Sequence, residues 1–359
     1  MWDILRTGLA FAVDLGVLIF VHELGHYLAA RSQGVTVEVF SIGFGPALLK
    51  WTARSGTVWQ VSALPLGGYV RMQGWGGQDD KTLKTPGSFA AAPLASRAVI
   101  VAAGPLANLV LAFVLFAGLY MTVGRVVTQP VLSEILPNSP AAAAHLQPGD
   151  RVLDIGGTKV GDFGTLQSII VENPDTVLDF TIQRGTAVFT TPVQLGEVSA
   201  DGETAGRLGV VGKDSAVQRF TPPAAIAAAA GETAAQIRGW VGMLGQLVVH
   251  HQGLSDLAGP LGILQITGQA AALGIIAFVN LVAIISINLG LANLIPIPIL
   301  DGGYLVAYAL EAVLRRPLSA AVREAALRFG ALLILTLVLF VTFNDLTRLG
   351  AIAWLTHLL

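Results

Sequence analysis

Charged residues are absent from three long stretches of the chain, and this pattern predicts membrane-spanning helices. Residues 98–124, 257–300 and 329–344 contain no Asp, Glu, Lys or Arg. A helix needs about 20 predominantly apolar residues to cross a bilayer. The stretch 257–300 is too long for one span, and Pro296 and Pro298 cannot lie inside a continuous helix. We therefore expect a second span in the first stretch, a broken third span in the next and a short fourth span in the last.

The apolar segment from residue 7 to residue 30 predicts the first span. Its length would also suit a secretory signal peptide, but no small-residue cleavage site precedes Arg31. We therefore interpret it as a retained helix. Titratable residues are rare in hydrocarbon, and this segment contains Asp14, His22, Glu23 and His26. The pattern offers no role for Asp14.

The chain between these spans is soluble in character. Residues 31–96 contain turn residues and strand-like alternation, as in Val35–Phe40. Residues 126–213 alternate β-branched runs with turns, which predicts a small α+β or all-β domain. Residues 221–252 are rich in Ala with few breakers, which favours a helix that leads back to the membrane.

Composition supports a membrane protein. Of the 359 residues, 53% are hydrophobic and 12% are charged, and the mean hydropathy is +0.68, whereas soluble domains carry about 25% charged residues. These values exclude a disordered chain. A net charge of −2 gives no basic field for nucleic acid. Cysteine is absent, so a metal site would have to use His, Asp or Glu.

Basic residues predict the orientation of the spans. The loop that follows the first span contains Arg31, Lys50, Arg54, Arg71, Lys81, Lys84 and Arg97. The loop before the last span contains Arg315, Arg316, Arg323 and Arg328. Short loops rich in Lys and Arg stay in the cytoplasm. We therefore expect the soluble domain and both termini on the extracytoplasmic side.

The first span contains a metal-binding motif, His22-Glu23-Leu24-Gly25-His26. In this H-E-x-x-H pattern the two His side chains lie on one side of a helix, about 40° apart, and can share one Zn²⁺. Glu23 lies beside the position of a metal-bound water and can act as general base. The alternative is a pair of buried, hydrogen-bonded histidines, which would leave the charge of Glu23 in hydrocarbon without a partner.

The motif lies inside the membrane, near the cytoplasmic face. Arg31 follows His22 by nine residues, or roughly 13 Å along a helix. Hydrolysis at that depth requires a water-filled cavity.

Asp301 is the candidate for a third protein ligand. It follows the proline pair in Asn293-Leu294-Ile295-Pro296-Ile297-Pro298-Ile299-Leu300-Asp301-Gly302-Gly303. Unwound backbone at membrane depth is tolerated where it lines a cavity, and an acid at such a break is functional by default. The alternative is an N-cap for a helix over residues 302–314, a role that is compatible with ligation. The other histidines, at positions 145, 250, 251 and 357, fall in the soluble domain or at interfaces.

Together the two motifs resemble the site-2 protease family of intramembrane zinc metalloproteases, and the RseP-type bacterial members most closely. The similarity extends over most of the chain. It includes Phe40–Pro46, Leu64–Val70, Ala103–Asn108, Gly253–Ile263, Ser286–Gly290 and Phe343–Leu346.

This resemblance implies a role for each matching residue. His22, His26 and Asp301 would bind Zn²⁺, and Glu23 would be the catalytic base. Asn288 and Asn293 would contact the substrate backbone or the oxyanion, whereas the alternative for both is packing between helices. The segment 35–75 would form a membrane-associated β-hairpin whose edge holds an unwound substrate as an added strand.

The soluble domain resembles a bacterial PDZ domain in the segment Ser139–Gly157. RseP-type proteins commonly carry two such domains, whereas residues 126–213 have room for one. The domain could bind a peptide terminus by strand addition or exclude bulky substrates, and the sequence leaves both roles open.

The expected fold is a polytopic α-helical membrane protein of about four spans, with a cytoplasmic-side β-hairpin region and one extracytoplasmic PDZ-like α+β domain. Its parts are expected at 1–30 (first span), 31–96 (hairpin region), 97–124 (second span), 126–213 (PDZ-like domain), 221–275 (interfacial helices), 276–314 (broken third span), 326–345 (fourth span) and 346–359 (C-terminal tail).

The expected activity is that of a zinc endopeptidase in a bacterial inner membrane. Its partners would be single-span membrane proteins, cleaved during regulated intramembrane proteolysis, with an anti-sigma factor or signal-peptide remnants as substrates. Two alternatives stay open. One is a membrane zincin of another family that uses Glu as its third ligand, and the other is a non-enzymatic PDZ scaffold.

Overall fold

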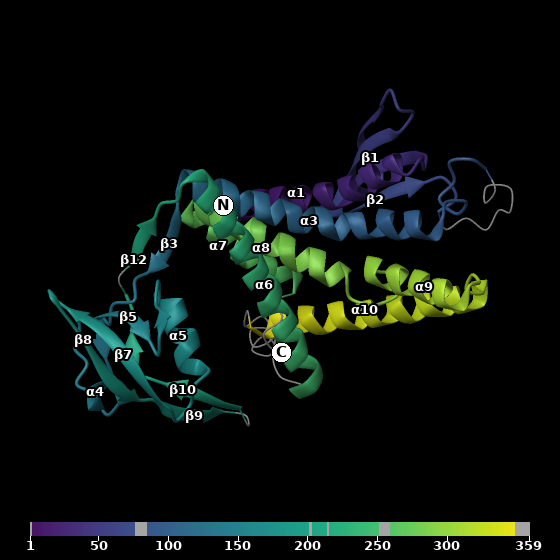
Figure 1. Ribbon diagram of the computed structural model, residues 1–359. Coiled ribbons are helices and arrows are strands. Elements are labelled where there is room, and N and C mark those ends of the chain that lie inside the picture. Colours follow the sequence, from purple (N-terminus) through teal and green to yellow (C-terminus); the bar gives the residue numbers. More distant parts are fainter. Residues whose placement is uncertain (1, 76–84, 201–202, 214, 251–258, 349–359) are drawn as a thin grey trace, which may run out of the picture. The chain divides into compact units, whose positions relative to one another are not determined.

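The computed structural model describes all residues except 1, 76–84, 201–202, 214, 251–258 and 349–359 (Figure 1). The chain divides into two compact units. One unit comprises residues 1–119 and 226–359, and the other comprises Tyr120–Ala225.

Four helices in the described part of the first unit and its junctions are long and apolar enough to cross a membrane. They are α1 (Trp2–Ser32), α3 (Leu94–Thr122), α8 (Ile275–Asn293) and α10 (Ala320–Arg348). Helix α10 begins six residues before the expected fourth span, because the polar sequence around Arg323 is already helical. These helices expose many large apolar side chains, as expected for helices that face lipid.

Strands β1 (Val37–Thr52) and β2 (Val58–Met72) form more than a simple hairpin. Residues 39–42 of β1 pair on one side with residues 58–61 and on the other with residues 68–71. Residues 47–52 also pair with residues 58–62. Both strands therefore bend, and their four segments form one sheet in which residues 39–42 have partners on both sides. This sheet lies against α1, where Phe40 is fully buried and stacks on Trp59.

Helix α7 (Pro260–Leu273) packs against α1 and is held by two buried carboxylates. Asp14 accepts a hydrogen bond from the Thr267 hydroxyl at 3.2 Å. Asp345 of α10 accepts from the amides of Gly259 and Gly262 at 3.0 and 2.9 Å. The first amides of a helix have no partner within the helix, so Asp345 acts as a cap supplied from another helix. The structure thus assigns Asp14 a contact that the sequence did not suggest.

Two further helices complete this part of the chain. Helix α6 (Pro222–His250) precedes α7, and residues 251–258 between them lie outside the described part. Helix α9 (Asp301–Leu314) follows α8 after a short break. The expected broken third span is therefore two separate helices, because Pro296 and Pro298 interrupt the helical hydrogen bonding.

The second unit is built on a sheet with the strand order β6-β5-β7-β8. These strands are β5 (Arg151–Ile155), β6 (Thr158–Lys159), β7 (Val177–Arg184) and β8 (Ala187–Gln194). The short helices α4 (Pro140–Ala143) and α5 (Phe163–Val171) contribute to the same hydrophobic core, which includes Phe180, Leu166 and Ala141. Helix α5 is capped by the Asp162 side chain, which accepts from the Thr165 amide.

Smaller strand pairs connect this core to the chain on either side. Strand β3 (Arg125–Thr128) pairs with β12 (Ser215–Gln218), β4 (Glu134–Ile135) pairs with β11 (Val210–Val211), and β9 (Gly196–Ala200) pairs with β10 (Glu203–Arg207). Because β12 belongs to this unit, the unit extends beyond the expected boundary at residue 213.

An ion pair in the second unit joins a buried carboxylate to a partly exposed guanidinium. The Asp150 carboxylate is fully buried, and the Arg184 guanidinium donates to both of its oxygens at 2.7 and 2.8 Å. Burial by itself would raise the pKa of Asp150, but the hydrogen bonds from Arg184 and from the Gln147 amide outweigh it. The pKa of Asp150 is therefore below its usual value, and the carboxylate stays charged.

Candidate metal centre

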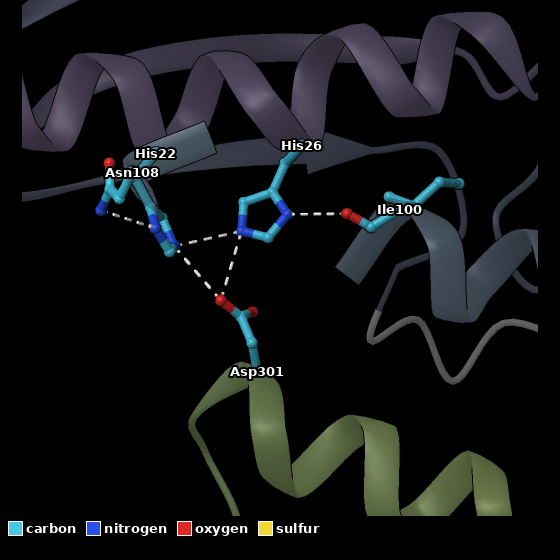
Figure 2. Close-up of polar contacts among 5 residues, drawn as sticks. All are labelled: His22, His26, Ile100, Asn108 and Asp301. Carbon is cyan, nitrogen blue, oxygen red and sulfur yellow. Dashed lines mark hydrogen bonds and ion pairs between the residues drawn. The ribbon is translucent and has the colours of Figure 1, made fainter. Parts of the chain in front are cut away.

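His22 and His26 lie one helical turn apart on α1, so both imidazoles project from the same side of the helix (Figure 2). Their Nε2 atoms are 3.2 Å apart. Both side chains are nearly buried, with exposed fractions of 12% for His22 and 10% for His26.

Asp301 approaches these histidines from α9, a helix that is distant in the sequence (Figure 2). Its Oδ2 atom lies 3.2 Å from His22 Nε2 and 3.5 Å from His26 Nε2. Leu300 occupies the N-cap, and Asp301 is the first residue of the helix. Asp301 is therefore not the N-cap residue of α9, which was the alternative role considered for it. A carboxylate in the first helical turn is favoured by the helix dipole.

The break before α9 is compact because glycines follow Asp301. A Cβ atom on Gly302 would collide with the carbonyl oxygens of Leu294 and Ile295, and one on Gly303 would collide with that of Ile297. Ile299 has φ of 96°, a conformation that costs a β-branched residue about 1–3 kcal/mol. The sequence Asp-Gly-Gly after two prolines thus allows the carboxylate to reach its position at the start of the helix.

The three side chains fit a tetrahedral metal ion. Ligand atoms about 2.0–2.1 Å from zinc lie roughly 3.3–3.4 Å from each other in a tetrahedron. The observed separations of 3.2, 3.2 and 3.5 Å agree with this value. Two imidazoles and a carboxylate are also a common zinc donor set that leaves a position for water. No other group of three such residues lies this close together in the described part of the chain.

Helix α3 orients His26 and lies very close to it. The Nδ1 atom of His26 donates to the Ile100 carbonyl oxygen at 2.9 Å, which leaves the lone pair on Nε2, the atom that faces Asp301. A Cβ atom on Gly104 would collide with the His26 ring, and one on Gly25 would collide with the backbone of Ala103. The glycine in the H-E-L-G-H motif therefore permits the close approach of α1 and α3.

Glu23 lies between the two histidines in sequence and is buried, with 9% of its surface exposed. It is close enough to His22, His26 and Asp301 to interact with them electrostatically. Its Cγ atom would lie only 2.9 Å from a Cβ atom on Gly68 of β2. The glycine at position 68 thus allows the sheet to pass directly beside this carboxyl group.

The two asparagines that were expected to contact the substrate lie on α8 and do not bond to the proposed ligands. Asn288 is exposed on α8, and Asn293 is half-buried at the end of that helix. Neither forms a hydrogen bond with the three clustered residues in the described part of the chain.

A third asparagine, Asn108 of α3, does contact the cluster. Its Nδ2 atom lies 3.4 Å from His22 Nδ1 (Figure 2). Asn108 ends the segment Ala103–Asn108, which resembles the site-2 protease family, but the resemblance implied no role for this residue. A polar amide in an otherwise uncharged span is by itself a weak indicator, because such residues often serve helix packing.

The sequence matches peptidase family M50 over residues 10–337. The chain belongs to peptidase family M50. This confirms the resemblance to site-2 proteases, and it removes the alternative of a membrane zincin from another family.

Relatives match this chain over nearly its full length. Atu1380 of Agrobacterium fabrum, provisionally named a zinc metalloprotease, is 38% identical over 94% of this chain and 95% of its own. Metalloprotease MmpA of Caulobacter vibrioides is 35% identical over 93% of this chain and 94% of its own.

One solved structure covers part of the chain only. The PDZ domain of the SdrC-like protein Lmo2051 of Listeria monocytogenes is 15% identical, with a TM-score of 0.21, over 24% of this chain and 87% of its own.

Proposed function

We propose that this protein is a multi-pass intramembrane zinc endopeptidase of a bacterial inner membrane, and that it cleaves single-span membrane proteins within their membrane segment. The observation that carries the proposal is the meeting of His22, His26 and Asp301, three candidate ligands from two helices, beside Glu23. The relatives' metalloprotease names agree with it and weigh against the non-enzymatic scaffold.

The chemistry follows from the positions of these side chains. Zinc bound by the three residues would act as a Lewis acid and would make water more acidic. The Glu23 carboxylate accepts a proton from the attacking water and delivers it to the leaving amine. Asn293, at the end of α8, is the proposed donor to the developing oxyanion, and Asn288 is the proposed contact to the substrate backbone.

The sheet of β1 and β2 is the proposed substrate holder. A substrate helix must unwind before attack, because its amides are occupied by helical hydrogen bonds. Pairing with a sheet edge keeps the unwound segment extended and satisfies its backbone groups. The segment around Gly68 is next to Glu23 and belongs to one outer segment of the sheet. A substrate added there would lie beside the proposed base.

The direct test is membrane proteomics of cells in which the protein carries Glu23→Gln. We expect short fragments of single-span membrane proteins to accumulate. One end of each fragment should be the site where an earlier protease removed the extracytoplasmic part. A strain with the wild-type protein restored should lose these fragments. Equal fragment levels in the two strains would contradict the proposed substrate class, whereas the identity of the fragments would name the substrates, such as an anti-sigma factor or signal-peptide remnants.

The orientation of the chain is a second prediction. The loop from residue 31 to residue 97 and the loop from 315 to 328 are rich in Lys and Arg, so both should lie in the cytoplasm. A reporter fused after Leu83 should report a cytoplasmic position, and one inserted near Asp175 should report export. The reverse pattern would place the metal centre near the opposite face and contradict the proposal.

The proposed role of the second unit, a PDZ-like domain, is to exclude substrates that still carry a folded extracytoplasmic domain. The chain between β3 and β12 can be deleted with little disturbance at its ends, because Thr128 lies opposite Ser215 in this strand pair. Replacing residues 129–214 with Asn-Gly should close this pair as a hairpin. We expect the shortened protein to cleave a pre-trimmed substrate as before and to cleave the untrimmed substrate as well.

The measurement is cleavage of matched trimmed and untrimmed substrates in cells. Loss of cleavage of the trimmed form, with zinc still bound, would show that the unit captures the new terminus instead. Unchanged cleavage of both forms would show that it does not control access.

A further inference from the structure

The side chain of Asn108 is buried against the proposed zinc ligand His22, and one of its polar atoms is left over. Asn108 is fully buried on α3. Its Oδ1 atom has no hydrogen-bond partner in the described part of the chain, while Nδ2 lies 3.4 Å from His22 Nδ1. A buried acceptor without a partner is destabilising, so its position beside a candidate ligand calls for a physical reason.

The amide orientation determines which nitrogen of His22 carries the proton. An amide nitrogen is only a donor, so His22 Nδ1 must accept in this arrangement. The proton of the neutral ring is then on Nε2, where it faces Asp301 Oδ2 at 3.2 Å. His26 has the opposite tautomer, because its Nδ1 atom donates to the Ile100 carbonyl oxygen.

A metal ion on His22 requires the proton to move. Ligation uses the lone pair of Nε2, so the proton of the neutral ring must be on Nδ1. The Nδ1–H group of His22 would then face the N–H groups of Asn108, so that two donors meet without an acceptor. Rotation of the Asn108 amide by half a turn exchanges its two ends and brings Oδ1, the atom without a partner, to His22.

We propose that Asn108 is a positioning residue for the metal centre, whose amide oxygen accepts the Nδ1–H of His22 when zinc is bound. This inference rests on the proposed function, because it assumes that His22 is a ligand. It assigns α3 the same task at both histidines: the Ile100 carbonyl orients His26, and Asn108, two helical turns further along, orients His22. Ser286 of α8 donates to the Asn108 backbone carbonyl at 2.8 Å, a contact that does not involve the amide side chain.

The test is zinc affinity of the full-length purified protein, measured by competition with a chelator. Asn108→Leu preserves the size of the side chain and removes the acceptor, and it should weaken zinc binding about 10- to 100-fold. Asn108→Asp supplies only acceptors and should keep zinc affinity at the wild-type value, even if the buried charge lowers the melting temperature. Cobalt-substituted protein should show an altered visible spectrum in Asn108→Leu alone.

Ser286→Ala is the matched control, because it removes the contact to the Asn108 backbone and leaves the side chain intact. It should bind zinc as the wild type does. Wild-type affinity in Asn108→Leu, or equal weakening in Asn108→Leu, Asn108→Asp and Ser286→Ala, would overturn the proposal. If Asn108→Leu does not fold, the zinc affinities of Asn108→Ala and Asn108→Asp are compared instead. Asn108→Ala should bind zinc more weakly than Asn108→Asp, and equal affinities would overturn the proposal. These outcomes differ from those expected if the proposed function itself is wrong. In that case the wild type would bind no zinc, or His26→Ala would bind zinc as tightly as the wild type.

Discussion

Replacing Glu23 with Gln should leave zinc bound and slow peptide cleavage by about 10²- to 10⁴-fold. Glutamine has nearly the same shape as glutamate, so the close packing of this side chain against Gly68 should persist. Its amide cannot accept a proton from the attacking water, because a neutral amide is a very weak base. Zinc content and cleavage of a single-span substrate, both in detergent, are the measurements.

Glu324→Gln is the matched control for this variant. Glu324 lies on α10 and pairs with Arg328 at 2.6 Å, with 63% of its side chain exposed. An exposed ion pair contributes little, so Glu324→Gln should cleave at the wild-type rate. Cleavage by Glu23→Gln at the wild-type rate would remove Glu23 from the mechanism, and loss of zinc would show that it acts in metal binding.

Replacing Asp301 with Ala should abolish tight zinc binding and, with it, cleavage. The variant removes one of three proposed ligands, so the loss of affinity should exceed the roughly 100-fold that outer-shell changes cause. The two histidines remain on α1, and two ligands are too few for a catalytic zinc site. The measurement is zinc affinity by chelator competition, followed by cleavage with excess zinc.

Asp14→Ala serves as the control, because Asp14 is also a buried acid in a span but contacts Thr267 of α7. It should retain zinc. Zinc binding of wild-type strength in Asp301→Ala would show that another residue completes the site. Loss of zinc in both variants would point to general disruption of the membrane helices, which the melting temperatures would reveal.

Much of this architecture can be predicted from local patterns. The uncharged stretch 98–124 predicts α3, and the two prolines predict the break before α9. Both signals depend on neighbouring residues only, since span length and helix interruption are local properties. The sheet is different. Alternation predicts strands near residues 35–61, but not that residues 39–42 pair on both sides, because such pairing depends on how β2 bends back.

The candidate site divides in the same way. H-E-x-x-H places His22 and His26 together through helical periodicity alone. Asp301 could be selected because an acid at a helix break is unusual in a membrane. The role of Asn108 was not visible, because its distance to His22 depends on how α3 packs on α1, and that packing follows from glycines at positions 25 and 104.

By itself, the sequence determined which segments are helical and apolar, where the third span breaks, and which residue types could hold a metal ion. These properties follow from the spacing of nearby residues and from the cost of charge in hydrocarbon. Only the tertiary structure decided that Asp301 reaches both histidines, that Asp345 caps α7 and that Asn108 contacts the cluster. Each of these contacts joins residues from different helices, and the close packing that creates them has no signature in any single segment.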